Sequence, residues 1–358
     1  LVARHPEIGD ALVRSRNFAD PGRAWLAAAL SPAQRDTARE QFFAASTNVN
    51  RFNWNAEVIN LLAEKPSEEL ATRLRGLWSR TDLHDAIVQA LAATPAAMDY
   101  PWYVGALASA DFRTVAAALT ALTELEDRTP RQTLAPVMRA FHRAVAQPAQ
   151  AATRKAAIGW LRKHAGWKGA IEETSTDRPS LELTYRPLFN WFAAEHPAVG
   201  AIIAGMSEDE FKYWETQLKD APWTLGKLDR GANLFKERRC AECHGGGPGF
   251  GPDLAGAARL RSPEGLLRTV IYPHLDVAPG AGVVELRLRD GGSLTGIVVF
   301  ESLEHLLLRQ ENGETVRVTQ GSIAQRRVTQ DSTMPLGLLK GVNARGLADL
   351  YAYLETLR

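Results

Sequence analysis

Apolar residues recur at helical spacing over roughly the first 166 positions of the chain. Several of these runs lead towards a proline, at Pro66, Pro95 and Pro130, and a second apolar run follows each proline. Proline cannot continue a helix, so each one predicts a helix end. The spacing of three or four residues predicts helices on both sides of each turn. The runs are Val58-Leu61-Leu62, Leu70-Leu74-Leu77, Ile87-Val88-Leu91, Trp102-Val104-Leu107, Val115-Leu119-Leu122 and Leu134-Val137-Phe141.

Pairs of helices that recur about every 30–40 residues are typical of HEAT and armadillo repeats. The sequence therefore predicts a mainly α protein in which residues 1–166 form a HEAT/armadillo-like α-solenoid. An irregular helical bundle is the alternative. Asp20-Pro21 and Ser31-Pro32 predict further helix starts, and the last helix, which contains Trp160, is expected to end near Gly166.

Residues 167–224 have a different composition and are predicted to be a linker followed by a helical connector. Positions up to about 180 are polar and rich in turn-forming residues, whereas those that follow carry many aromatic side chains. We expect the aromatic residues to pack between two domains rather than to form a ligand cage. They are Tyr185, Phe189, Trp191, Phe192, Phe211, Tyr213, Trp214 and Trp223.

Strict alternation of apolar and polar residues marks a β-rich segment near the C-terminus. Strands are predicted at 283–289, 294–300, 305–310, 315–318 and 323–328, with turns at Asp290-Gly291-Gly292 and Asn312-Gly313. Strands this short predict a small antiparallel barrel, SH3-like in type, with a twisted open sheet as the alternative. The segment, about residues 281–328, is expected to be an insertion in the domain formed by residues 225–358.

Composition excludes some classes of function. Among the 358 residues, 23% are charged and the net charge is +1, so no overall field favours nucleic acid or an anionic membrane. No apolar run approaches the roughly 18 residues of a membrane-spanning helix. The chain begins at Leu1 without the pattern of a signal peptide. We expect such a peptide to have been removed or to lie outside this chain.

The only two cysteines of the chain lie in Cys240-Ala241-Glu242-Cys243-His244. Cys-x-x-Cys-His is the attachment signal of c-type haem, because two thiols at this spacing reach the two vinyl groups of a porphyrin. The adjacent His244 is then carried under the iron as an axial ligand. The motif predicts one covalent haem c, and hence export, since such attachment takes place outside the bacterial cytoplasm.

Two other kinds of site use similar motifs. A structural zinc site needs four Cys or His ligands, but Cys240, Cys243 and His244 supply only three. A redox dithiol of the thioredoxin type lies in a βαβ unit, whereas residues 231–239 are predicted to be helical. Both alternatives are weaker than haem attachment.

The helix before the motif and the last helix of the chain are expected to cross closely. Gly231 and Phe235 lie on one face of the first helix, and Leu350, Tyr353 and Leu354 form a stripe on the second, residues 344–357. Small Gly231 lets the helices approach, with Phe235 packed on Leu350 and Tyr353. Crossed terminal helices of this kind are the framework of class I cytochromes c.

Met334 is the predicted second axial ligand. It lies in Ser332-Thr333-Met334-Pro335, just before the last helix, where the proline stiffens the loop. A haem with Met and His ligands has both axial positions filled and transfers electrons rather than binding substrate. Of the other methionines, Met98 and Met138 are predicted to be packing residues of the helical repeats, and Met206 precedes a separate helix. His274 is the rival ligand.

Three further residues are candidates for contacts with the haem. Pro252, in Gly251-Pro252-Asp253-Leu254, can present its carbonyl to Nδ1–H of His244, with a plain turn as the alternative. Arg259 and Arg261 can face the haem propionates, or else lie on the solvated surface.

The order of these motifs resembles the C-terminal haem-binding domain typical of Planctomycetes and Verrucomicrobia. The resemblance covers about residues 225–358 and rests on Cys-x-x-Cys-His, Gly-Pro-Asp-Leu, a helix ending near Pro273, Ser-x-Met-Pro-x-Gly-Leu-Leu and Leu-Ala-Asp-Leu-Tyr-Ala-Tyr-Leu. It implies that Cys240, Cys243, His244 and Met334 hold the haem; His274 departs from the small polar residue expected at its position. In that family the domain often follows HEAT-like repeats, themselves often preceded by a propeller domain resembling sorbosone or glucose dehydrogenases.

The function expected from motif and resemblance is electron transfer in the periplasm or another exported location. The haem would accept electrons from a sugar- or alcohol-type dehydrogenase, as a domain or subunit, and pass them to another carrier, with the solenoid as docking arm. On its own the chain is not expected to be an enzyme. The alternatives are a partner- or glycan-binding scaffold with an ancillary haem, and a peroxidase-like haem enzyme with a labile distal ligand.

Overall fold

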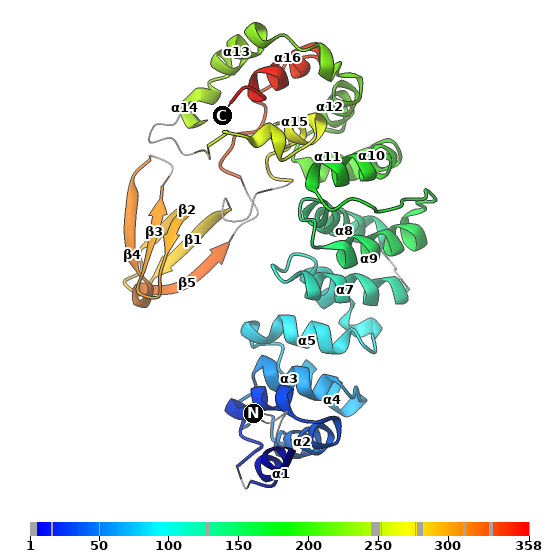
Figure 1. Ribbon diagram of the computed structural model, residues 1–358, viewed down its shortest axis with the longest axis vertical. Coiled ribbons are helices and arrows are strands. Elements are labelled where there is room, and N and C mark those ends of the chain that lie inside the picture. The colour runs from blue at the N-terminus through cyan, green and yellow to red at the C-terminus, as the bar shows by residue number, and fades with distance from the viewer. Residues whose placement is uncertain are drawn as a thin grey trace. The chain divides into compact units, whose positions relative to one another are not determined.

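The computed structural model describes residues 6–15, 17–49, 51–126, 129–244, 251, 253–275, 277, 282–310, 313–328 and 332–357. The protein is mainly helical, and the described residues include one five-stranded antiparallel sheet (Figure 1). The chain divides into two compact units. The first contains Leu1–Phe141 and Gln150–Gly166, and the second contains His142–Ala149 and Trp167–Arg358.

The first unit consists of short helices. They are α1 (Pro6–Arg14), η2 (Pro21–Ala29), α2 (Pro32–Ala45), α3 (Ala56–Ala63), α4 (Glu68–Arg75), η3 (Thr81–Leu83), α5 (His84–Leu91), η4 (Ala97–Asp99), α6 (Tyr100–Ala106), α7 (Phe112–Glu124), α8 (Pro130–Val145, which continues into the second unit), α9 (Ala151–Trp160) and the π-helix η5 (Leu161–Ala165).

Alternate helices of the first unit pack on one another. The helix α5 contacts both α3 and α7, and α7 contacts α9. Apolar residues dominate their facing sides, where Val58, Ile87, Val115 and Leu119 are completely buried. The intervening helices also contact this row: α4 contacts α5, and α6 contacts both α5 and α7.

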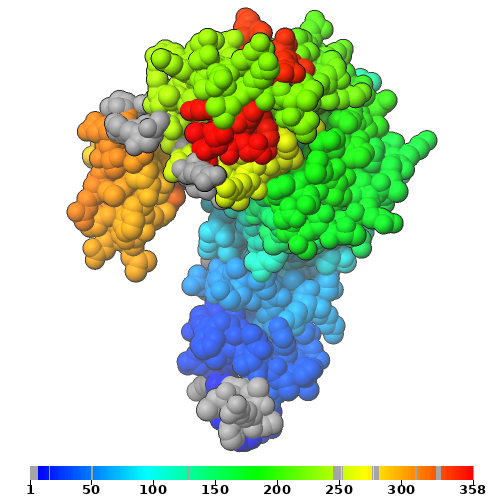
Figure 2. All heavy atoms as spheres, turned by 45° about the horizontal axis from the view of Figure 1, so that its top comes forward, coloured from blue at the N-terminus to red at the C-terminus, as the bar shows by residue number. Residues whose placement is uncertain are grey.

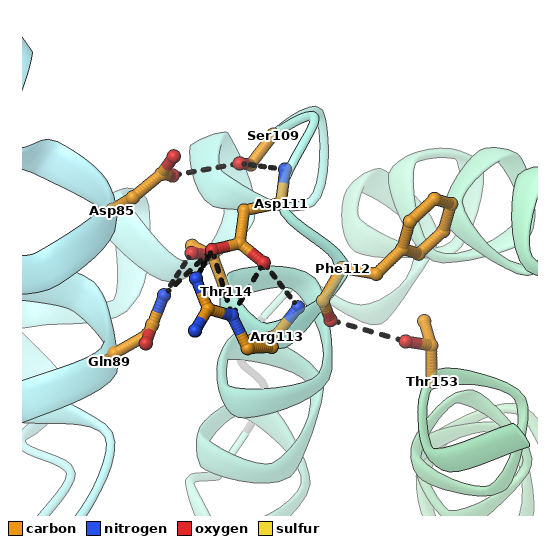
Figure 3. Close-up of polar contacts among 8 residues, drawn as sticks. All are labelled: Asp85, Gln89, Ser109, Asp111, Phe112, Arg113, Thr114 and Thr153. Atoms are coloured by element: carbon orange, nitrogen blue, oxygen red, sulfur yellow. Dashed lines mark hydrogen bonds and ion pairs between the residues drawn. The ribbon is translucent and has the colours of Figure 1, made fainter. Parts of the chain in front are cut away.

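Polar side chains join the N-terminal end of α7 to α5 and α9 (Figure 3). Asp111 caps α7 by accepting a hydrogen bond from the Arg113 amide at 2.9 Å. Gln89 of α5 donates to the Thr114 hydroxyl at 2.7 Å. From the other side, the Thr153 hydroxyl of α9 donates to the Phe112 carbonyl at 3.2 Å. These bonds fix the register of three consecutive packed helices.

The predicted helix boundaries in the first unit are confirmed. Pro66 and Pro95 lie between helices, and Asp20 and Ser31 cap η2 and α2. The last helical turns end at Gly166, whose φ of 82° is readily adopted only by glycine. The sequence did not predict that two helices continue through a proline, as α8 does at Pro136 and α10 at Pro187.

The helices of the second unit surround a separate core. They are α10 (Arg178–Glu195), α11 (Pro197–Ala204), α12 (Glu208–Asp220), η6 (Trp223–Leu225), α13 (Leu228–Glu237), α14 (Cys240–His244), η7 (Ala257–Arg259), α15 (Pro263–Ile271) and α16 (Ala344–Leu354). The core includes Phe211 and Trp214 of α12, Leu267 of α15, and Leu347 and Leu350 of α16. Part of the aromatic connector is therefore packed into the helical core that adjoins the cysteine motif.

The helices α13 and α16 cross in close contact, as predicted (Figure 1). A Cβ atom on Gly231 would lie 1.9 Å from the carbonyl oxygen of Asp349, and one on Gly226 would lie 2.1 Å from that of Ala348. The rings of Phe235 and Tyr353 pack with centroids 5.1 Å apart. Figure 2 shows the red C-terminal helix against the yellow-green segment that contains α13.

The five predicted strands are all present. They are β1 (Val283–Leu288), β2 (Ser293–Glu301), β3 (His305–Arg309), β4 (Thr315–Thr319) and β5 (Ile323–Val328), in the order β4-β3-β2-β1-β5. All pairs are antiparallel, with irregularities after Arg287 and Val298. Val284, Leu286, Leu306, Leu308 and Val318 form a core of their own. The alternation along β1 puts Glu285 and Arg287 on the opposite, exposed face.

Candidate functional site

The cysteine motif forms a short helix of its own rather than continuing the helix before it. The helix α13 ends at Glu237, and Arg239 adopts a left-handed conformation with φ of 60° before α14 begins. Residues three and four apart lie on the same side of a helix. Cys240 therefore shares a side of α14 with Cys243 and His244, the arrangement that two thioether links and an adjacent imidazole ligand require.

Cys240 lies at the edge of the helical core. It packs against the cluster that includes Leu350, whereas Cys243 is exposed. Burial raises the pKa of the Cys240 thiol above its usual range. Redox-active dithiols have a lowered thiol pKa instead. The environment of Cys240 therefore does not support the redox-dithiol alternative.

A structural zinc site would need a cluster of Cys or His side chains. Among the described residues, no group of three or more His, Cys, Asp or Glu side chains is arranged to hold a metal ion. A haem makes no such demand, since its porphyrin supplies four ligands and the protein supplies only the axial ones.

The ring of His244 packs against the backbone of Gly251. The Gly251 amide donates to the Cys243 carbonyl at 3.1 Å. A Cβ atom at position 251 would lie 2.6 Å from Cε1 of His244 and 2.7 Å from its Nδ1. The chain thus returns across one edge of the imidazole and limits its rotation, which suits an axial ligand. The predicted contact from Pro252 lies outside the described residues.

Met334 lies on a loop that borders the same core as Cys240. Two residues that follow it, Leu339 and Val342, belong to that core. Leu336 contacts Gly205, with 3.6 Å between its Cδ1 atom and a Cβ built on that glycine. Tyr213 donates to the Val342 carbonyl at 3.0 Å. The loop therefore runs from Met334 into α16 over a fixed path.

The other methionines differ in their surroundings. Met138 is completely buried, as predicted, and Met206 is partly buried against the helical core of the second unit. The prediction for Met98 is wrong: it lies on η4 with 70% of its surface exposed. Its spacing fitted a helix face, but the chain forms a single 3₁₀ turn there and points the side chain outwards.

His274 is engaged in a way that disfavours the rival assignment. Its Nδ1 accepts a hydrogen bond from the Ser332 amide at 3.0 Å. An accepting Nδ1 puts the proton of the neutral ring on Nε2, which leaves Nε2 without a lone pair for a metal. In this arrangement the Nδ1 atom of His274 holds the Ser332 amide of the loop that carries Met334.

The two candidate arginines lie in different surroundings. Arg259 is exposed at the end of η7. Arg261 is mostly buried, with Nη1 3.8 Å from Oε1 of Glu182, and both residues line a hollow within the second unit. Arg261 thus already faces a carboxylate of the chain. A role of either arginine towards a propionate stays a prediction.

Glu182 is a residue whose role sequence reasoning missed. Its Oε2 accepts hydrogen bonds from the amide and hydroxyl of Ser262, both at 2.8 Å, at the start of α15. Its Oε1 accepts one from Arg178 at 3.0 Å. The i,i+4 spacing of Arg178 and Glu182 signals the ion pair, but nothing local signals the distant Ser262.

A scan against protein-family models finds none that matches the chain, and a search of curated proteins finds no significant similarity. Among the described residues, no helix is both long and apolar enough to span a bilayer.

Proposed function

We propose that the chain is a monohaem c-type electron-transfer protein. The single observation that carries the proposal is the motif helix: the only two cysteines lie one turn apart on α14, and His244 follows on the same side. Gly251 supports the fit, because its lack of a side chain lets the backbone pass along the edge of the His244 ring.

Each residue has a distinct task in this proposal. The thiols of Cys240 and Cys243 would hold the haem by adding across its two vinyl groups, each S–H hydrogen going to a vinyl carbon without net oxidation. His244 supplies the imidazole ligand, and its ring is oriented by Gly251. Met334 would supply a thioether from a loop that is held by hydrogen bonds. The bound haem supplies reversible one-electron chemistry.

The finer features of the fold support this proposal. We infer that residues 1–166 form a HEAT/armadillo-like solenoid, because α3, α5, α7 and α9 pack in succession. The close crossing of α13 and α16 supports a class I cytochrome c domain in residues 225–358. A fifth strand paired with the first of a four-strand meander, with irregularities in β1 and β2, is compatible with a small SH3-like barrel.

The proposed partners follow from the chemistry. A protein whose iron has both axial positions filled exchanges electrons with other proteins, here a dehydrogenase that donates and a carrier that accepts. The solenoid would dock one of them, and the location would be periplasmic or otherwise exported. The rate of cyanide binding separates this function from the peroxidase-like alternative.

Covalent attachment is tested first. The chain, produced with a c-type maturation system, is expected to gain the mass of one haem and to retain it after denaturation in acid. The double variant Cys240→Ala/Cys243→Ala should lose the covalent haem. A chain that binds no haem under these conditions, or binds zinc through the motif, would contradict the proposal.

The second ligand is tested with two methionines of the same unit. Met334→Ala is expected to abolish the red charge-transfer band of the oxidised protein and to lower the reduction potential, because the thioether is lost. Met206→Ala, which removes a methionine packed on the core, should leave the band in place. A band that persists in Met334→Ala would overturn the ligand assignment. Fast cyanide binding by the unmodified protein would favour the peroxidase-like alternative.

A further inference from the structure

A turn after α15 forms a rigid platform beside the Met334 loop. Tyr272, at the start of this turn, is only 1% exposed, and its hydroxyl donates to Oε1 of Glu215 at 2.9 Å. The Leu275 amide donates to the Tyr272 carbonyl at 3.0 Å. Burial, together with the negative charge of Glu215, raises the pKa of Tyr272 well above its usual value. The hydroxyl therefore stays protonated and keeps donating.

The acceptor of this hydrogen bond is itself fixed. Both oxygens of Glu215 accept hydrogen bonds from Arg268, at 2.5 and 3.0 Å, in a bidentate pair. Arg268 also donates to Glu264 at 3.0 Å. Burial alone would lower the pKa of Arg268, but the charges of Glu215 and Glu264 outweigh it and raise that pKa. The anchor of the turn is thus a charged network that spans α12 and α15.

His274 projects from this platform to the Met334 loop. The loop contributes two amides in succession: Ser332 donates to Nδ1 of His274 at 3.0 Å, and Met334 donates to the hydroxyl of Ser332 at 3.1 Å. All of these groups are partly buried. Without the imidazole, the Ser332 amide would lose its acceptor in a partly buried place.

We propose that His274 is a positioning residue that holds Met334 in place through Ser332. The proposal rests on the proposed function for the meaning of Met334, but the hydrogen bond itself can be tested without any haem. What the site requires at position 274 is an acceptor in the place of Nδ1. An asparagine can offer its side-chain oxygen there, whereas a leucine of similar size cannot.

The test compares His274→Asn with His274→Leu in the full chain that carries haem. In His274→Leu the Met334 loop should detach more often, because one hydrogen bond is lost. The apparent affinity for cyanide at the sixth position should therefore rise about tenfold, and the charge-transfer band should weaken. His274→Asn should restore both properties towards those of the unmodified protein. Equal behaviour of all three proteins would overturn the proposal, as would a failure of asparagine to rescue a folded leucine variant.

A second readout separates this proposal from the function on which it rests. Hydrogen exchange of the Ser332 amide, measured in the haem-free chain, should be about five- to tenfold faster in His274→Leu and nearly unchanged in His274→Asn. If exchange changes in this way but Met334→Ala keeps its band, the positioning is correct and the ligand assignment is wrong. If the Leu variant does not fold, His274→Ala takes its place in both measurements.

Discussion

At the scale of single residues, Asp111 shows how one carboxylate organises a helix start. It accepts from the Arg113 amide, from the Arg113 guanidinium and, at 3.3 Å, from Gln89 of α5 (Figure 3). The hydrogen bond from the Arg113 side chain, ahead of the other contacts, lowers the pKa of Asp111. A carboxyl with a lowered pKa in the folded state stabilises the fold above its unfolded pKa and loses that contribution as pH falls through the folded value.

Two substitutions at Asp111 separate the cap from the charge. Asp111→Ala should lower the free energy of unfolding by about 1 kcal/mol at neutral pH, because α7 loses its N-cap. Asp111→Asn keeps a capping oxygen and should lower the free energy of unfolding by less. The difference between the unmodified protein and Asp111→Asn should shrink below about pH 4, the ordinary pKa range of aspartate. Urea unfolding at several pH values measures this difference in the free energy of unfolding. A difference that grows on acidification would contradict the lowered pKa of Asp111.

Residue roles could be predicted from sequence where the chemistry is local. Cys240, Cys243 and His244 were recognisable because five consecutive positions carry the whole motif. The function proposed for His274 was not, because its partner Ser332 is 58 positions away. It depends on a turn anchored by Glu215 and Arg268, which no periodicity reveals. His274 could be noted as a rival ligand, but only the direction of its hydrogen bond argues for support rather than ligation.

At the scale of elements, the crossing of α13 and α16 depends on glycine. A Cβ atom on Gly231 would overlap the Asp349 carbonyl, and that contact is with backbone, which cannot rotate away. Gly159, near the end of α9 where the helix continues into η5, offers a matched contrast, since nothing lies within 4 Å of a Cβ built there. The same substitution should therefore have opposite effects in the two helices.

Glycine-to-alanine changes test this contrast. Gly231→Ala should destabilise the protein by about 1–3 kcal/mol, because the helices must move apart. Gly159→Ala should be neutral or stabilise by up to about 1 kcal/mol, because alanine favours the helix without a clash. Thermal or urea unfolding of the two variants beside the unmodified protein gives both values. A Gly231→Ala protein as stable as the original would show that the crossing tolerates a side chain.

Elements with a strong pattern were predictable, and those without one were not. The alternation of Val284 and Leu286 with charged neighbours identified β1, and the turn residues bounded the other strands. The residues around Met98 carry no such signal, and a 3₁₀ turn formed where a regular helix face was expected. The continuation of α8 and α10 through a proline could not be predicted either, because a proline locally favours the end of a helix and only tertiary packing overrides that preference.

At the scale of the whole molecule, the two compact units have separate apolar interiors. Residues such as Val115 and Leu119 fill the first, whereas Phe235 and Leu350 belong to the helical core of the second. We therefore expect two transitions in calorimetric unfolding of the full chain. Asp111→Ala should shift only one of them, and Gly231→Ala only the other. A single transition displaced by both variants would show that the units unfold together.

The hydrogen bond between His274 and Ser332 also has a topological consequence. The Ser332 amide and Nδ1 of His274 lie 3.0 Å apart, although the two residues are 58 positions apart in the sequence. The chain therefore leaves the helical core of the second unit and returns to it at the same place. The strands between them carry their own interior, formed by Val284, Leu286 and their neighbours. The length and surface of such an inserted module can change without disturbing the helical core, provided that His274 and Ser332 still form their hydrogen bond.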